Sequence, residues 1–153
     1  MLRTLLIAAL SAIVLALAPA ALAQKAQFGS AAEARAMLER AVDALKVNET
    51  QAVESFNKGD GGFRDRDLYL FCFMMKDGSV VAHIRPDQIG LDVKAVKDAT
   101  GKPFGRELYN AANENQVTEV NYMFPRPGSV VPEEKVSFVT RVGNMGCGVG
   151  YYR

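Results

Sequence analysis

The 153-residue sequence has few of the residues on which most catalytic and metal sites depend. It contains one histidine, His83, and two cysteines, Cys72 and Cys147. A catalytic zinc needs three protein ligands, and a hydrolase needs a nucleophile with a base. No G-x-S-x-G, H-E-x-x-H, C-x-x-C or C-x-x-C-H motif occurs. We therefore expect no enzyme, no metal ion and no cofactor, covalently attached haem included.

The sequence also lacks an excess of either charge. Lysine and arginine total 18, and aspartate and glutamate total 17. A nearly neutral chain gives no reason to expect nucleic acid or an anionic membrane as a partner. No internal repeat or low-complexity tract is present, so the chain is expected to form one ordinary domain.

The N-terminus has the three parts of a secretory signal peptide. A short basic start is followed by an apolar run from Leu5 to Leu17 and by the A-x-A cleavage pattern Ala21–Ala23. We expect residues 1–23 to be removed and residues 24–153 to form the mature domain, in the periplasm or outside the cell. A membrane anchor is the alternative, but the apolar run is shorter than the ~20 residues that a spanning helix needs. No stable membrane insertion is expected after cleavage.

The two cysteines can pair in an oxidising compartment. A Cys72–Cys147 bridge would close a long loop, which the chain-entropy model values at roughly 4–5 kcal/mol. The alternative is two buried free thiols, since free cysteine often acts as a small core residue. The residues alone favour the disulfide and leave both alternatives open.

The stretch from Asp67 to Arg85 predicts a β-hairpin. Its two apolar runs are joined by Asp77-Gly78, which is typical of a two-residue type I′ turn. The resulting register places Cys72 opposite His83. Because side chains alternate along a strand, one face of the hairpin is expected to carry Leu70, Cys72, His83 and Arg85. The other face is expected to carry Phe71 and Phe73. A single β-bulge would reverse this assignment.

The sequence before the hairpin predicts a helix that covers the sheet. Ser30 and Glu33 have capping-box spacing, and apolar residues recur at helical intervals as far as Phe56. The segment 47–50 is a poorer helix former, so a break or kink is expected there. Core packing explains the apolar stripe, and a homodimer seam along this first helix is the alternative.

Three further strands are expected after the hairpin, over residues 117–124, 135–142 and 145–152. The last of them carries Gly146, Gly148 and Gly150 on one face. Glycine weakens a strand, so such a row indicates that another element or a ligand approaches closely.

Short motifs, in this order and spacing, resemble the single Cache domains (type 2), which are PAS-like extracytoplasmic sensor modules. They are FNKG at 56–59, DLYLF at 67–71, DG at 77–78 with AH at 82–83, GKPF at 101–104, VNYMFPRP at 120–127 and CGVGYY at 147–152. The resemblance implies an α+β fold with a long N-terminal helix packed on a five-stranded antiparallel sheet of strand order 2-1-5-4-3. That order makes the first and fifth strands neighbours and so implies the Cys72–Cys147 disulfide. Family members usually continue into a membrane helix and a signalling domain, whereas this sequence stops at Arg153, so a stand-alone exported form is expected.

The resemblance also implies that a small molecule, often a small carboxylate, binds in a pocket on the sheet. A carboxylate needs fixed donors in a partly dry pocket with apolar walls. The candidate ligand-binding residues are His83, Arg85, Tyr122, Phe124, Arg126 and Lys135. Structural roles are the alternatives: a strand histidine bonded to backbone, a solvated arginine and core aromatic rings.

Two other functions remain open from the sequence. One is a ligand-free interaction module that docks on a membrane receptor or forms a homodimer. The other is an enzyme that uses a thiol–imidazole pair of Cys72 and His83, which a disulfide at Cys72 would preclude.

Overall fold

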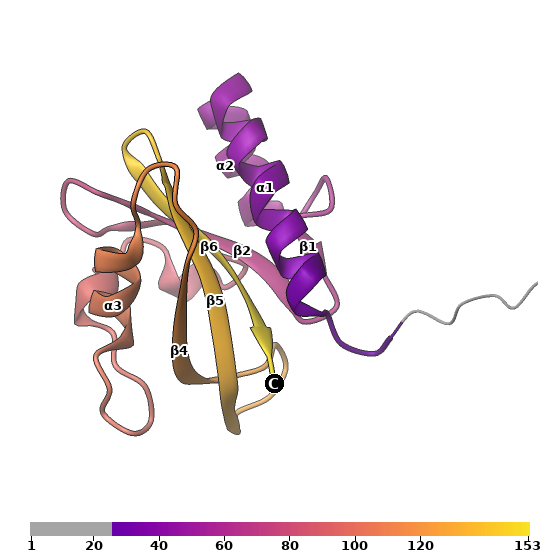
Figure 1. The fold of residues 1–153 in the computed structure, drawn as a ribbon, viewed down its shortest axis with the longest axis vertical. Helices are drawn as coiled ribbons and strands as arrows, with labels where there is room; N and C mark the ends of the chain where they lie inside the picture. Colours follow the sequence, from indigo (N-terminus) through magenta and orange to yellow (C-terminus); the bar gives the residue numbers. More distant parts are fainter. Residues whose placement is uncertain (1–25) are drawn as a thin grey trace, which may run out of the picture.

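The computed structural model describes residues 26–153, so the predicted signal peptide lies outside the described residues. The chain forms helices and strands in the order shown in Figure 1. These elements are α1 (Ala31–Val47), α2 (Glu49–Lys58), β1 (Arg64–Asp65), β2 (Leu68–Met74), β3 (Val80–Ala82), η1 (Pro86–Gln88), η2 (Val93–Ala95), α3 (Phe104–Ala111), β4 (Thr118–Pro125), β5 (Pro132–Val142) and β6 (Met145–Tyr152). None of the helices in this part of the chain is both long and apolar enough to span a membrane.

The strands form one antiparallel sheet in the order β1-β2-β6-β5-β4, with β3 also paired to β2. Numbered without the two-residue β1, this is the predicted order 2-1-5-4-3. The predicted α+β fold is therefore confirmed, with β1 as a sixth short strand. Helices α1 and α2 cover one face of the sheet, and α3 lies on the other (Figure 1).

The N-terminal helix begins and breaks where the sequence predicts. Ser30 accepts a hydrogen bond from the Glu33 backbone, and the Glu33 side chain accepts one from the Ser30 backbone, which completes the capping box. Asn48 has an extended backbone; it ends α1 and caps α2 by accepting a hydrogen bond from the Gln51 N–H. The predicted long helix is thus two consecutive helices.

The predicted register of the hairpin is wrong. Met74 donates its backbone N–H to the Ser79 carbonyl, so the loop has four residues instead of two. A β-bulge then shifts the pairing, and Cys72 lies opposite Ala82. Because β3 is only three residues long and the register is displaced by one, His83 lies on the face opposite to Cys72.

The β2–β6 pairing brings the two cysteines together. Cys72 lies directly opposite Cys147, their Cα atoms are 4.1 Å apart, and the two residues form a disulfide. Both are fully buried under α1. The thiol–imidazole pair considered from the sequence is therefore not formed, since Cys72 is oxidised and His83 faces the other way.

The glycine row of β6 lies under large side chains of the neighbouring strands. A Cβ atom at Gly146 would lie 2.4 Å from the Phe73 ring, and one at Gly148 would lie 2.5 Å from the Phe71 ring. At Gly150 it would lie 2.1 Å from Lys135 Cε. The predicted close approach is confirmed, and it lets these side chains lie flat across the sheet.

Candidate functional site

A small cavity lies on the sheet face opposite α1, between the strands and the segment from η1 to α3. Its volume is about 50 Å³. Most of its lining is apolar or aromatic: Tyr69, Phe71, Val80, His83, Gln88, Val93, Val96, Phe104, Leu108, Tyr122 and Phe124. Apolar walls with a few fixed polar groups are the usual composition of a small-molecule site.

An aromatic cluster forms one wall of this cavity. The rings of Phe104 and Tyr122 stack with their centroids 4.1 Å apart, and Phe124 meets both edge-on. The Tyr122 hydroxyl forms a 2.8 Å hydrogen bond with Ser137 Oγ. Burial raises the Tyr122 pKa, so this hydroxyl stays neutral. Packing and hydrogen bonding together hold the wall in place.

Lys135 lies behind this wall and is 1% exposed. Its Nζ donates a 2.8 Å hydrogen bond to the Tyr69 hydroxyl. Three aromatic rings surround the amine, with Nζ-to-centroid distances of 4.0 Å for Tyr69, 5.0 Å for Tyr152 and 5.2 Å for Phe124. Within residues 26–153 it forms no ion pair with a carboxylate.

Burial lowers the pKa of Lys135 from its ordinary value to about 7. Asp67 opposes this shift from a distance, and Arg126 adds to it. The buried amine therefore loses its proton far more readily than an exposed lysine does. An anion beside it would favour the charged form.

His83 is the titratable group that lines the cavity. Its ring meets the Tyr69 ring edge-on with centroids 5.1 Å apart, and its Nδ1 accepts a 3.0 Å hydrogen bond from the Arg85 backbone N–H. Burial, with Lys135 and Arg85 nearby, lowers the His83 pKa to about 4. The imidazole is therefore neutral at physiological pH, and its contribution to a site is polar, without a positive charge.

Arg126 lies outside the cavity and is held by acidic residues. Its guanidinium forms ion pairs with the buried Asp67 and, at 2.9 Å, with Glu133. It is sandwiched between two aromatic rings, 4.0 Å from the Phe28 centroid and 4.4 Å from the Tyr152 centroid. The same Asp67 accepts a 2.7 Å hydrogen bond from the Gly29 N–H. Through Asp67, these contacts join the segment before α1 to the sheet.

Arg85 also lies outside the cavity. Its side chain is about half exposed and pairs with Asp87 at 2.6 Å. Of the six predicted site residues, the structure thus brings His83, Tyr122 and Phe124 to the cavity, and it places Lys135 directly behind it. Arg85 and Arg126 line a neighbouring hollow.

Tyr69 was not predicted as a site residue from the sequence. It lines the cavity, and its hydroxyl accepts the hydrogen bond from Lys135. The contribution of the segment 88–108, from which Gln88, Val93 and Phe104 line the cavity, was not predicted either. The alternation of β2 was the available signal, because it places Tyr69 on the same face as Phe71 and Phe73.

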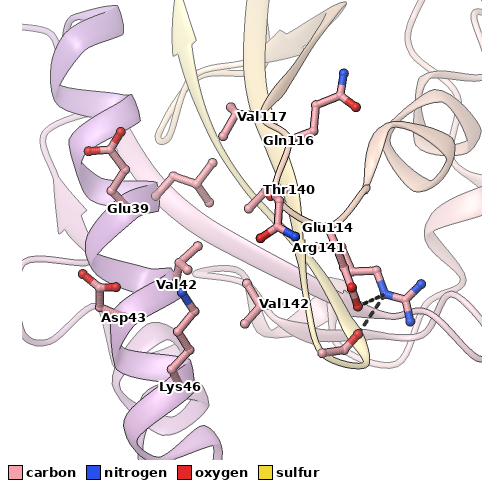
Figure 2. Close-up of a pocket in the computed structure, with 13 residues that line it drawn as sticks. Glu39, Val42, Asp43, Lys46, Glu114, Gln116, Val117, Thr140, Arg141 and Val142 are labelled. Carbon is pink, nitrogen blue, oxygen red and sulfur yellow. Dashed lines mark hydrogen bonds and ion pairs between the residues drawn. The ribbon is translucent and has the colours of Figure 1, made fainter.

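A separate hollow of about 490 Å³ lies between α1 and the β5–β6 turn (Figure 2). Its floor is apolar, and its rim carries charges of both signs. On that rim Arg141 pairs with Glu114 at 3.7 Å and donates a 2.8 Å hydrogen bond to the Gly143 carbonyl. The cavity beside Lys135 is the candidate site, because there a buried amine lies against Tyr69 and Phe124, two of the rings that line the cavity.

Comparisons with known proteins identify the family and support the fold. The family model for Single Cache domain 2 matches residues 17–152. Three solved structures are similar to the chain. A methyl-accepting chemotaxis protein from Vibrio parahaemolyticus has 20% identity and a TM-score of 0.64, with 79% of this chain and 86% of that chain covered. A periplasmic sensor domain of a chemotaxis protein has 25% identity and a TM-score of 0.60, with 77% and 86% covered.

The third is a Cache chemosensory domain described for its recognition of carboxylic acids, with 21% identity, a TM-score of 0.57, and 76% and 84% covered. The curated proteins contain no match. The family match spans most of the sequence, and the similar structures share the fold. The chain belongs to the Single Cache domain 2 family of extracytoplasmic sensor modules.

Proposed function

We propose that this protein is an exported, periplasmic sensor module that binds a small organic acid beside Lys135. The buried Lys135 ammonium carries the proposal. A charged amine out of water needs a counter-ion, and a lone tyrosine hydroxyl is a weak substitute. The carboxylate of a ligand would supply the missing charge.

The surrounding residues suit such a ligand. The Tyr122 hydroxyl and the neutral His83 ring offer further hydrogen-bonding groups, and Phe104 and Phe124 offer apolar walls for a short carbon chain. The cavity is small, so the carbon chain must be short. A Cache domain of the same fold recognises carboxylic acids, which makes this fold compatible with such a ligand.

A thermal-shift and calorimetry panel of acetate, propionate, pyruvate and lactate tests the proposal. At least one acid should raise the melting temperature in a concentration-dependent way, since a ligand at 100 times its Kd stabilises by about 2.7 kcal/mol. Lys135→Met should abolish the shift. Lys76→Met, at a lysine whose side chain is 73% exposed, is the matched control and should leave it unchanged.

A folded Lys135→Met protein that binds the acid with wild-type affinity would remove Lys135 from the site. No shift with any acid would reject the organic-acid ligand and favour the interaction module that docks on a receptor.

A further inference from the structure

Another hollow, of about 400 Å³ and distinct from the one beside α1, adjoins the cavity on the side of the β4–β5 loop. Tyr69 and Phe124 line both spaces. The Lys135 amine lies against these same two rings. One pair of side chains therefore separates the buried cation and its cavity from the outer hollow, which we call the arginine basin.

Three arginines line the arginine basin: Arg64 from β1, Arg85 from the segment after β3 and Arg126 from the loop after β4. No acidic residue of the described chain lines it. Three segments of the chain, β1, the residues after β3 and the loop after β4, thus each bring an arginine to one hollow. Concentrating positive charge in a concave space raises the local concentration of anions.

Two of these arginines have capacity for a further anion. The Arg85 Nε and Nη2 donate to Asp87, and no bond to its Nη1 occurs among residues 26–153. That exposed pair is worth little, so the guanidinium can exchange Asp87 for a ligand. The Arg64 side chain has no hydrogen bond or ion pair in the same part of the chain. Arg126 differs because Asp67 and Glu133 hold it.

We infer that the ligand is a short dicarboxylate. One carboxylate binds Lys135, the carbon chain lies between Tyr69 and Phe124, and the second carboxylate binds Arg85 and Arg64 in the arginine basin. This inference rests on the proposed function and narrows its ligand class. The inner cavity has room for only about four water-sized groups, at roughly 10–15 Å³ each, so the second polar end of any longer acid reaches the basin.

Calorimetry with matched acids tests the inference on the exported protein. Malonate, succinate and glutarate are each compared with the monocarboxylate of equal carbon number: propionate, butyrate and valerate. At least one dicarboxylate should bind tenfold or more tightly than its partner. Arg64→Gln combined with Arg85→Gln should reduce that dicarboxylate to the affinity of its partner and leave the monocarboxylate unchanged. Arg106→Gln, at an exposed arginine of α3, is the control and should change neither.

The outcomes separate the two proposals. Equal or tighter binding of every monocarboxylate overturns the dicarboxylate inference and leaves the proposed function standing. An equal loss for both classes in the double variant also overturns it, because the arginines would then act on the whole site. If no acid of either class binds, the proposed function falls, and this inference with it.

Discussion

The Nζ atom of Lys135 lies 2.8 Å from the Tyr69 hydroxyl, and both side chains are buried. Burial raises the pKa of Tyr69 well above its ordinary value and lowers that of Lys135 to about 7. Both shifts favour the neutral forms. The pair is thus a neutral hydrogen bond above pH 7 and an uncompensated buried cation below it. The protonated, buried Lys135 therefore lowers the free energy of unfolding.

Replacing Lys135 with methionine should stabilise the unliganded protein at pH 6 by about 1–4 kcal/mol, the range found when buried ion pairs are replaced by apolar residues. In the wild type the unfolded lysine holds its proton up to its ordinary pKa of 10.5, whereas the folded one releases it near 7. Stability should therefore rise with pH between about 7 and 10. Urea titrations across this range measure both effects. A Lys135→Met protein that keeps the same rise would contradict the assignment.

Affinity for an organic acid should fall as the pH rises above 7. A bound carboxylate raises the Lys135 pKa, so binding takes up a proton when the free amine is neutral. The decrease approaches tenfold for each pH unit until the pKa of the bound state is reached. Calorimetry at pH 8 in phosphate and in Tris should show different binding heats, because the two buffers supply the proton at different enthalpy. Identical heats would indicate that no proton is taken up.

His83 should make the protein sensitive to acid. Its pKa is about 4 in the folded protein and about 6.5 when unfolded. As the pH falls from 6.5 to 4, His83 binds a proton in the unfolded state but not in the folded state, so stability is lost. The loss attributable to this group is about 3 kcal/mol. His83→Gln should flatten the pH dependence in this window, and an unchanged profile in that variant would exclude His83 as the cause.

The sequence predicted the fold more completely than the site. Helix caps, the break at Asn48 and the strand periods are local signals, and the family motifs supplied the strand order. The position of His83 could not be predicted because it depends on a bulge between Val80 and Ala82, which has no clear sequence signature.

The candidate site shows the same division between local and distant signals. Lys135 was identifiable as a cation at the start of an apolar strand. Arg126 was predicted as a ligand-binding residue, and its partner Asp67, 59 positions away in the sequence, was not predicted. Such partners become visible only when the sheet brings β2 and the β4–β5 loop together.

The Asp67 carboxylate makes two interactions that substitutions can separate. It ion-pairs with Arg126, and it accepts the Gly29 N–H ahead of α1. Asp67→Asn removes the charge but keeps an acceptor for Gly29, whereas Asp67→Ala removes both. Each variant should lose about 3 kcal/mol of stability, because Arg126 then lacks one of its counter-ions in a mostly buried position.

Only Asp67→Ala should also accelerate amide hydrogen exchange in the peptide that covers residues 26–31. Mass spectrometry of exchange at equal unfolding free energy, adjusted with an osmolyte, makes the two variants comparable. Equal exchange in both would show that the Arg126 pair, and not the bond to Gly29, fastens this segment. Because Arg126 also stacks on Tyr152 beside Lys135, the comparison measures how firmly the candidate site is connected to the start of α1.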